Sequence, residues 1–442
     1  MYKPDISKLL NAESFAVIGA SRHKEKVGHA LFKNLLDSGK KVYPVNPKAD
    51  EILGQRAYKD LLEIPYDIDC ALIATPAKTT PLILRQAIQK KIPTAIIVSA
   101  GFSEFGNNEL EERIKQIALE SNITLLGPNV FGFVNPYSNT NTTFYKGMPK
   151  KGNIAFISQS GAIGAAILDK IDKLSSFVAL GNSSLLDFSD FIEYFEKDKN
   201  TKVIALYLES LKPGKGKRFI ETCKKCKKPI IAIKSGKTKS GQKASASHTS
   251  ALASELGIYE GIFKQSGIIE ANSIKELFQI ARFLKRIEKK QLGNKACIIT
   301  NAGGIGVLTT DYLSENKILV PGLPEKTKLK LSEFLPDGWS KNNPIDMIGD
   351  ALAEDYDKTI SILKSESWFD FFIVLLTPQY MTETMETAKA LIKLKQQTSK
   401  PIVACFFGGP QVEEASTLLH HNSIPVFNEP KEMCDVLGKI LN

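Results

Sequence analysis

The residue of this chain best suited to chemistry is His248, which lies in a loop of small residues at 245–251. An imidazole can accept a phosphoryl group when a carboxylate holds one ring nitrogen and leaves the other as the nucleophile. Glu209 is the candidate carboxylate, because it directly follows the apolar run Val203–Leu208 and precedes a Pro/Gly loop. A lone histidine in such a loop is more often a solvated residue, and Glu209 could instead cap a helix. The interpretation therefore depends on other segments.

Two segments could hold a phosphoryl group beside this histidine. Residues 154–164 and 298–306 each have the pattern of a strand, a turn of small residues and a helix start. The first N–H groups of a helix have no helical acceptor and carry the positive end of its dipole, so they bind anions. Such turns occur in every α/β protein, and neither segment is specific by itself. We expect phosphate to be bound at both helix starts: Ser160 with Gly161, and Gly303 with Gly304.

The elements that must position these residues repeat one theme three times, at intervals of about 140 residues, close to the size of one domain. Each opening, at 15–21, 154–161 and 296–304, is a β-branched run, a small-residue turn and an amphipathic helical pattern. Short apolar runs then alternate with helix-period stretches, which is typical of parallel sheets covered by helices on both faces. We predict an α/β fold of three doubly wound parallel-sheet domains, at 1–147, 148–290 and 291–442.

Composition limits the function classes. The 442 residues, 43% of them hydrophobic, are enough for two or three cores. The chain has no charged-then-apolar leader and no apolar run of about 18 residues, so we expect a cytoplasmic protein that does not enter a membrane. Its six scattered cysteines fit a reducing compartment. The net charge of +10 comes mostly from Lys spread along amphipathic helices, which favours a solvated basic surface over nucleic-acid binding.

The first opening predicts a nucleotide site, but not one for NAD. The NAD fingerprint combines Gly-x-Gly-x-x-Gly with an acidic residue after the second strand. This chain has a long basic glycine loop, and its second strand is followed by Asn46, Pro47 and Lys48. Cations at both loops favour a nucleotide with an extra phosphate. Coenzyme A, with its ribose 3′-phosphate, fits better than NAD, while NADP and a turn without a ligand remain alternatives.

Further strand ends fall at 74–77, 99–104 and 127–132. The carboxyl ends of parallel strands share one edge of the sheet, where ligands bind. We therefore expect coenzyme A to contact Gly19, Ala20, Ser21, Arg22, Lys26, Val27, Gly28, Asn46, Pro47, Lys48, Thr75, Pro76, Ser99, Ala100, Gly101 and Asn129.

Three other signals are weaker. Residues 236–243 resemble a phosphate-binding P-loop but lack its Gly-Lys-Ser/Thr ending. Cys223 and Cys226 have metal-ligand spacing but lie in a helical pattern without a second ligand pair. Residues 343–346 predict a structured turn, with lining of the site as the alternative. The sequence has no paired-carboxylate magnesium site with a glycine-rich nucleotide loop, so we expect no bound metal and an ATP site on another chain.

Eight short segments, taken in order, resemble the α subunit of ADP-forming acyl-CoA synthetases, which are relatives of succinyl-CoA ligase. They span essentially the whole chain: 17–21, 45–48, 100–102, 127–129, 158–161, 207–209, 247–249 and 300–304. The resemblance implies a Rossmann-like CoA-binding domain followed by two flavodoxin-like domains. It also implies that His248 is transiently phosphorylated, that Glu209 supports it, and that the two helix starts cradle the phosphate.

The family resemblance further implies a partner, an ATP-grasp β subunit that binds ADP or ATP with Mg, in an α2β2 assembly. The implied reaction converts acyl-CoA, phosphate and ADP into a carboxylic acid, CoA and ATP. Val130 stands where succinyl-CoA ligases tend to have Cys, and Leu185 and Ser250 replace an acidic residue and a Gly, so the acyl group stays open. The alternatives are a non-catalytic CoA-binding module and an NADP-dependent oxidoreductase, the latter disfavoured by Asn46.

Overall fold

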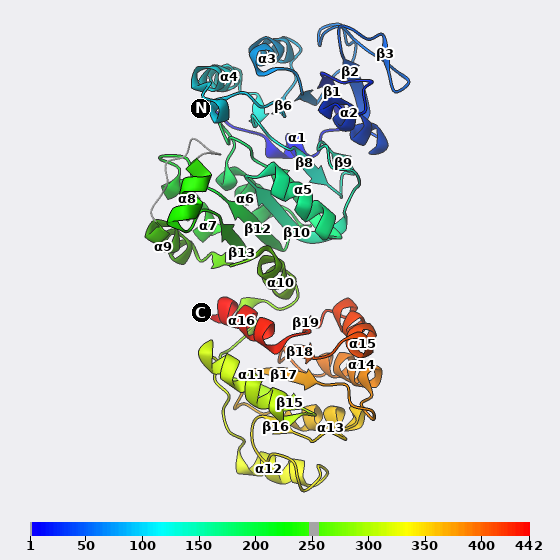
Figure 1. The fold of residues 1–442 in the computed structure, drawn as a ribbon, viewed down its shortest axis with the longest axis vertical. Coiled ribbons are helices and arrows are strands. Elements are labelled where there is room, and N and C mark those ends of the chain that lie inside the picture. Colours follow the sequence, from blue (N-terminus) through cyan, green and yellow to red (C-terminus); the bar gives the residue numbers. More distant parts are fainter. Residues whose placement is uncertain (1, 247–255) are drawn as a thin grey trace. The chain divides into compact units, whose positions relative to one another are not determined.

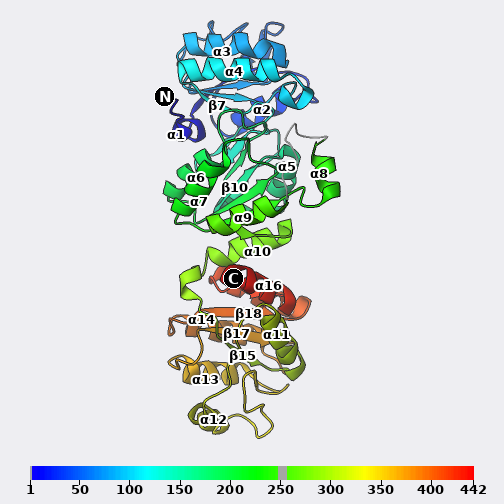
Figure 2. The same ribbon diagram turned by 90° about the vertical axis from the view of Figure 1, so that its left-hand side faces the viewer.

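The computed structural model describes residues 2–246 and 256–442. The chain forms two compact units, the first ending at Ala271 and the second running from Asn272 to Asn442. Figures 1 and 2 show that each unit is built of parallel sheets with helices on both faces. In the second unit, for example, α11 and α16 pack together on one face, and α13, α14 and α15 pack side by side on the other. The predicted α/β class is confirmed.

Three sheets share one strand order, in which the first strand of each lies between the second and the third. This is the doubly wound arrangement predicted from the sequence, and its ligand crevice lies where the chain reverses its direction across the sheet. The strands, in spatial order, are β2 (Lys41–Val45), β1 (Ser14–Ile18), β5 (Cys70–Ile73), β6 (Thr94–Ile97) and β7 (Thr124–Leu126) in the first sheet; β14 (Ile269–Glu270), β13 (Ile230–Lys234), β12 (Val203–Leu208), β10 (Lys150–Ser158) and β11 (Lys173–Ala179) in the second; and β16 (Ile345–Asp346), β15 (Ala296–Thr300), β17 (Phe371–Leu376), β18 (Ile402–Phe406) and β19 (Val426–Phe427) in the third.

The second sheet contains an extension that the sequence did not predict. Strands β8 (Phe133–Asn135) and β9 (Thr140–Asn141) follow the first sheet in the chain but pair antiparallel at the β11 edge. The predicted parallel sheet thus carries a short antiparallel extension at this edge. A separate hairpin, β3 (Glu51–Ile52) with β4 (Gln55–Arg56), follows β2.

The helices connect these strands as crossovers. They are α1 (Ile6–Leu10), α2 (Val27–Asp37), α3 (Thr80–Gln89), α4 (Asn108–Ser121), α5 (Gly161–Lys170), α6 (Phe188–Lys197), α7 (Gly216–Lys225), α8 (Lys239–Ala246), α9 (Leu256–Ser266), α10 (Ile274–Leu284), α11 (Gly303–Glu315), α12 (Glu325–Ser332), α13 (Ala353–Leu363), α14 (Thr384–Lys395), α15 (Pro410–His421) and α16 (Pro430–Leu441), with short 3-10 turns η1 (Ala77–Thr79), η2 (Ser103–Phe105) and η3 (Lys289–Gln291).

The cores explain the element choices. Strands β1, β5, β6, β12 and β17 are buried at every residue, as β-branched and aromatic runs covered on both faces must be. One apolar cluster continues from α1 and the first sheet through Phe133 into the helices beneath the second sheet, such as Phe191 and Phe219. The first two sheets therefore share a core, and this continuity makes residues up to Ala271 a single unit.

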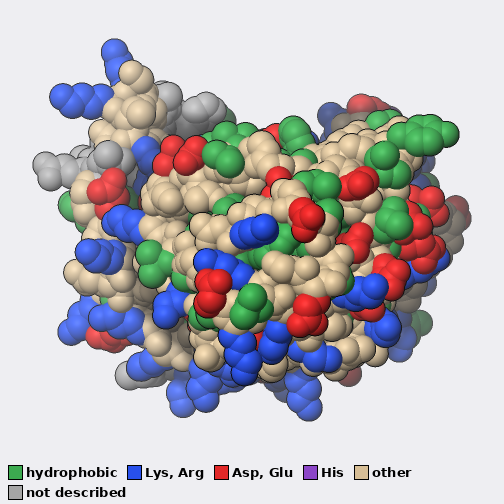
Figure 3. Space-filling model, turned by 90° about the horizontal axis from the view of Figure 1, so that it is seen from below, with side chains coloured by type: hydrophobic (Ala, Val, Ile, Leu, Met, Phe, Trp, Pro, Cys, Tyr) green, Lys and Arg blue, Asp and Glu red, His purple; other side chains and the backbone are tan. Residues whose placement is uncertain are grey.

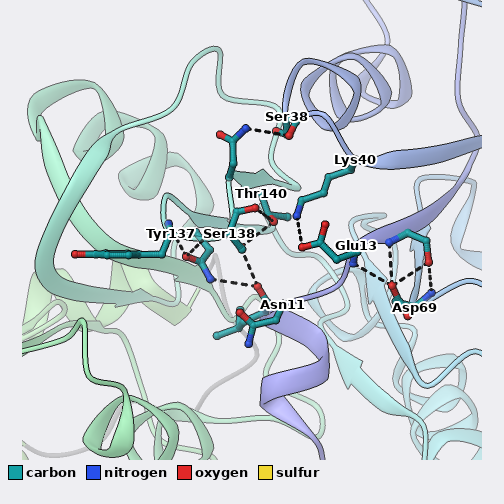
Figure 4. A network of polar contacts seen from close by, with 12 residues as sticks. Asn11, Glu13, Ser38, Lys40, Asp69, Tyr137, Ser138 and Thr140 are labelled. Carbon is teal, nitrogen blue, oxygen red and sulfur yellow. Dashed lines mark hydrogen bonds and ion pairs between the residues drawn. The ribbon is translucent and has the colours of Figure 1, made fainter.

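A polar network supports this junction (Figure 4). The carbonyl oxygen of Leu10 accepts hydrogen bonds from Asn135 Nδ2 at 3.2 Å and from Ser138 Oγ at 3.3 Å, which ties the end of α1 to the β8–β9 turn. Nearby, the buried Lys40 ammonium pairs with Glu13 at 2.6 Å. A buried cation needs such a partner, so the pair holds the start of β2 beside the start of β1.

Basic, acidic and apolar side chains are mixed on the surface drawn in Figure 3, and Lys and Arg are densest along its lower edge. Several lysines form i,i+3 or i,i+4 pairs on helices, such as Lys358 with Glu354 at 2.7 Å. Such exposed pairs add little stability but keep a Lys-rich surface solvated. Among the described residues, no helix is long and apolar enough to cross a membrane.

Gly164 gives a test of how α5 docks on the second sheet. A Cβ at Gly164 would lie 2.3 Å from Phe177 Cζ, and Phe177 is itself stacked on Phe156 with ring centroids 6.1 Å apart. Because that ring has no room to move, Gly164→Ala should lower the free energy of unfolding by about 1–3 kcal/mol in urea denaturation. Gly261→Ala, in a helix where a Cβ meets nothing within 4 Å, is the matched control and should be neutral or stabilising. Equal stabilities of the two variants would contradict the packing described here.

Candidate functional site

The first unit contains a pocket of about 1140 Å³, which is lined by the carboxyl ends of strands from two sheets. Its walls come from the turns after β5, β6 and β7 in the first sheet and after β10, β11 and β12 in the second. Residues as distant in sequence as Thr75 and Pro213 therefore face one space. Because ligands of open parallel sheets bind at this edge, the pocket is the candidate site.

The turn after β10 prepares a helix start for an anion. Ser158 Oγ donates to the Ser160 carbonyl oxygen at 2.8 Å and accepts from the Ser160 N–H at 3.1 Å, which fixes the turn. α5 then begins at Gly161, and Ser160, Gly161 and Ala162 all line the pocket. A Cβ at Gly161 would lie 3.1 Å from Phe131 Cβ, so a larger residue would crowd this start. Ser160 Oγ caps the helix by accepting from the Ile163 N–H at 3.4 Å, and the dipole at this helix start favours a bound anion.

Glu209 lines the same pocket, and the side-chain amide of Gln159 sets its position. Gln159 Oε1 accepts from the N–H groups of Glu209 at 2.7 Å and Ser210 at 3.0 Å, while Gln159 Nε2 donates to the Ser210 carbonyl oxygen at 2.8 Å. One amide thus joins the turn that carries the helix start to the turn that carries the carboxylate. No role for Gln159 was predicted, although its place directly after a buried strand is the signal that could have indicated one.

Six residues predicted to contact coenzyme A line this pocket, and five of them lie in the turns after strands: Thr75, Pro76, Ser99, Ala100 and Asn129. Their turns are bonded to one another. Ser99 Oγ donates to the Thr75 carbonyl oxygen at 2.5 Å, and the Asn129 N–H donates to the Ser99 carbonyl oxygen at 3.1 Å. Val27, the first residue of α2, lines the pocket as well. These ends of β5, β6 and β7 together with α2 form one wall.

The remaining predicted contacts are not among the described residues that line the pocket: Gly19, Ala20, Ser21, Arg22, Lys26, Gly28, Asn46, Pro47, Lys48 and Gly101. Most of them form the turns after β1 and β2, which Asn46 Nδ2 joins by donating to the Ala20 carbonyl oxygen at 2.8 Å. Gly28 packs on this turn so closely that a Cβ would lie 2.0 Å from the Gly19 carbonyl oxygen. Gly28 is thus required by the contact between this turn and α2, whereas a Cβ at Gly19, where φ is +93°, would lie 2.7 Å from the Ala74 carbonyl oxygen.

A partly buried polar cluster holds the two walls of the pocket together. Asn182 Nδ2, in the turn after β11, donates to Glu104 Oε2 at 2.5 Å and to Glu111 Oε2 at 2.8 Å. Glu111 also accepts from Ser184 Oγ at 2.5 Å and from the Ser103 N–H at 3.1 Å. Burial acts to raise the pKa of the Glu111 carboxyl, but the hydrogen bonds outweigh it and leave this pKa below its usual value.

The second unit repeats the turn built around Gln159. Thr300 Oγ1 donates to the Ala302 carbonyl oxygen at 3.1 Å and accepts from the Ala302 N–H at 3.0 Å. Asn301 Oδ1 accepts from the Thr377 N–H at 2.9 Å, and Asn301 Nδ2 donates to the Thr377 carbonyl oxygen at 2.8 Å. Asn301 therefore joins the ends of β15 and β17, and α11 begins two residues later at Gly303.

Residues 343–346 form the structured turn that the sequence predicted, and they are not among the described residues that line the pocket. Asn343 forms a structured turn, since its amide accepts from the Ile298 N–H at 2.9 Å and donates to the Ala296 carbonyl oxygen at 2.9 Å. Asp346, by contrast, reaches the start of α11, because a Cβ at Gly303 would lie 2.6 Å from Asp346 Oδ2. Gly304 has nothing within 4 Å of its Cβ direction, so the backbone there is open.

The histidine on which the interpretation depends, His248, lies outside the described residues, between α8 and α9 in the sequence.

Cys223 lies in α7, and burial raises its pKa to about 12, which fits a structural thiol. Within residues 2–246 and 256–442, no cluster of three or more His, Cys, Asp or Glu side chains could hold a metal ion.

The pKa of Glu111 predicts how the pocket responds to acid. A carboxyl whose pKa is lowered on folding contributes stability above its unfolded pKa, and this contribution is lost as pH falls through the lowered value. The free energy of unfolding of the wild type should therefore fall more between pH 7 and pH 3 than that of Glu111→Gln, measured by urea denaturation. Parallel pH profiles for the two proteins would show that Glu111 is not stabilised in its charged form.

Gln159 is predicted to position Glu209. Gln159→Leu removes all three hydrogen bonds to the 209–210 turn and should reduce turnover on the order of 100-fold, since small displacements at a reacting centre have effects of this size. Gln159→Glu retains the two acceptor contacts and should lose less. Steady-state kinetics of the chain with its partner, with thermal unfolding as the control for folding, measure both. Full activity of Gln159→Leu would exclude this role.

Known protein families match this chain along most of its length. Three family models match in succession: a CoA binding domain at residues 13–136, a succinyl-CoA ligase like flavodoxin domain at 151–284, and a ligase-CoA domain at 296–440. The subunit alpha of ADP-forming acetate–CoA ligase II from Pyrococcus furiosus is 41% identical over 438 residues, which cover 96% of this chain and 94% of that protein. These matches confirm the resemblance found in the sequence.

Two further relatives agree. An ADP-forming acetate–CoA ligase from Methanocaldococcus jannaschii is 43% identical over 97% of this chain, which spans 62% of that relative. The dinucleotide-forming acetyl-coenzyme A synthetase 1 of Ca. Korarchaeum cryptofilum, solved with phosphate and ADP, has a TM-score of 0.90 and 35% identity, covering 99% of this chain and 96% of that one. The chain therefore belongs to the family of ADP-forming acyl-CoA synthetases, alongside the α subunits of ADP-forming acetate–CoA ligases.

Proposed function

We propose that this chain is the α subunit of an ADP-forming acyl-CoA synthetase, which converts acyl-CoA, phosphate and ADP into a carboxylic acid, CoA and ATP. The observation that carries the proposal is that one pocket holds predicted CoA contacts, a helix start suited to phosphate and the carboxylate of Glu209. A module that only binds CoA has no need for the last two. The relatives that match the whole chain are named as ligases, which also disfavours that alternative.

In the first step, phosphate attacks the acyl carbonyl carbon, the C–S bond breaks, and CoA leaves as the thiol. The Ser160–Gly161 helix start would hold the phosphate and the resulting acyl phosphate through backbone N–H groups, which need no bound cation. The strand ends at Thr75, Ser99 and Asn129 would hold CoA. Arg22, Lys26 and Lys48 would supply charge for its phosphates from the turns after β1 and β2.

In the second step, His248 takes the phosphoryl group from the acyl phosphate, the P–O bond to the acyl group breaks, and the free acid leaves. Glu209 would accept a hydrogen bond from the other imidazole nitrogen, which fixes the tautomer and stabilises the charged ring. The amide of Gln159 holds the Glu209 backbone for this purpose. Gly303 and Gly304 would form a second phosphate-binding helix start.

In the third step, phosphorylated His248 transfers its phosphoryl group to ADP. We propose that ADP and Mg bind to an ATP-grasp β partner and that two copies of each chain assemble as α2β2. Relatives named as α subunits support a separate partner chain.

The six cysteines are all free, which supports a cytoplasmic setting. We also propose three functional domains, at 1–147, 148–290 and 291–442.

A phosphohistidine assay tests the proposal. The purified chain is incubated with phosphate and a panel of acyl-CoAs, and separately with ATP and the β partner, and an acid-labile phosphoryl adduct is sought by mass spectrometry. We expect the adduct on His248 in the wild type and none in His248→Asn. Glu209→Gln should slow its formation on the order of 100-fold. A wild-type chain without an adduct under both conditions, or an active His248→Asn, would overturn the proposed function.

A further inference from the structure

The pocket contains an apolar wall next to the helix start that is suited to phosphate. Five side chains that line the pocket form it: Val27, Phe131, Phe144, Ala162 and Ala165. Ala162 and Ala165 are three residues apart on the first turns of α5 and so share one helix face. Phe131 touches the α5 start directly, since a Cβ at Gly161 would meet it at 3.1 Å. This apolar wall therefore begins where the phosphate would bind.

The two aromatic rings of this wall differ in burial. Phe131 is 4% exposed and is anchored in the core, with its ring centroid 6.1 Å from that of Phe177. Phe144 stands edge-on to Phe131 at 4.4 Å between centroids, and 43% of its surface is exposed. Phe131 thus forms the floor of the wall and Phe144 its outer end. The exposed part of the Phe144 ring is apolar surface in contact with water, and an apolar ligand that covered it would be bound favourably.

Phe144 is nevertheless held in a fixed place. Asn34 Nδ2 donates to the carbonyl oxygens of both its neighbours, Thr143 at 2.7 Å and Tyr145 at 2.8 Å. The Tyr145 N–H also donates to Thr143 Oγ1 at 3.0 Å. Asn34 lies on α2, two turns after Val27, so the same helix contributes one side chain to the wall and fixes the loop that supplies another. The backbone that carries the Phe144 ring is thus pre-organised for a ligand.

The charges in the pocket select the kind of group that fits here. Among its described lining residues, Lys212 is the one cation, and Glu104 and Glu209 are the carboxylates. None of the five wall residues carries charge. A second carboxylate on the acyl group would lose its hydration against two aromatic rings without gaining a counter-charge. The wall therefore fits an uncharged alkyl or aryl group.

We propose that Val27, Phe131, Phe144, Ala162 and Ala165 form the subsite for the acyl chain, and that Phe144 determines the largest acyl group accepted. This inference rests on the proposed function, because it places the acyl group next to the phosphate at the α5 start. Substrate choice then depends on the space between Phe144 and the two alanines. Enlarging that space admits bulkier acyl groups, and filling it restricts the site to small ones.

Two substitutions with opposite effects test the inference. Phe144→Ala opens the outer end and should raise the ratio of kcat/KM for phenylacetyl-CoA to that for acetyl-CoA by roughly 10-fold, the usual effect of a pocket contact on discrimination. Ala165→Val fills the opposite side and should lower the same ratio. Phe105→Ala, which removes a ring that is 74% exposed and does not line the pocket, is the matched control and should leave the ratio unchanged.

Turnover is measured with the partner subunit, phosphate and ADP, and binding of the same two acyl-CoAs to the chain alone is measured by calorimetry. Opposite shifts in the two variants support the subsite, and they cannot come from general unfolding. An equal loss for both acyl-CoAs in Phe144→Ala would mean that the ring contacts CoA itself, and would overturn the inference, as would unchanged ratios. Binding without turnover in the wild type would instead reject the proposed function, while the acyl dependence of binding still decides the subsite.

Discussion

The structure depends on one kind of contact, in which a side-chain amide joins the ends of two neighbouring parallel strands. Just beyond a strand end, backbone N–H and C=O groups lose their partners in the sheet and must be satisfied elsewhere. Gln159 supplies both an acceptor and a donor to the turn after β12, and Asn301 does the same for the turn after β17. These side chains fix the turns from which α5 and α11 begin.

A second constraint keeps the pocket in shape. Its two walls belong to different sheets, but one apolar cluster runs beneath both of them. Separating the sheets would expose this cluster to water and would also break the bonds from Asn182 to Glu104 and Glu111. The two walls of the pocket are therefore held together by apolar packing and by hydrogen bonds to the carboxylates of Glu104 and Glu111. Such a frame can present N–H groups and a carboxylate at fixed positions, as electrostatic stabilisation requires.

The sequence allowed most of the fold to be predicted, because apolar runs such as Phe371–Leu376 identify buried parallel strands. It missed β8 and β9, which are three and two residues long and include the polar residues Thr140 and Asn141, so no alternation is visible. Strand-end residues such as Ser99 could be assigned to the pocket edge by a general rule of parallel sheets. The cluster around Glu111 could not, since Glu111 and Asn182 are 71 residues apart and no local spacing relates them.

The two turns that a side-chain amide closes differ at the first residue after the neighbouring strand. The strand-end position after β12 is an acid, Glu209, whereas its counterpart after β17 is Thr377. The hydrogen bonds of the two turns match, since each amide accepts from a backbone N–H group and donates to a backbone carbonyl oxygen of the neighbouring turn. A carboxylate can accept a hydrogen bond from an imidazole and so fix its orientation, whereas a hydroxyl at the same place adds no charge. Two turns closed by the same kind of amide contact can therefore differ in chemistry through the side chain that stands at the strand end.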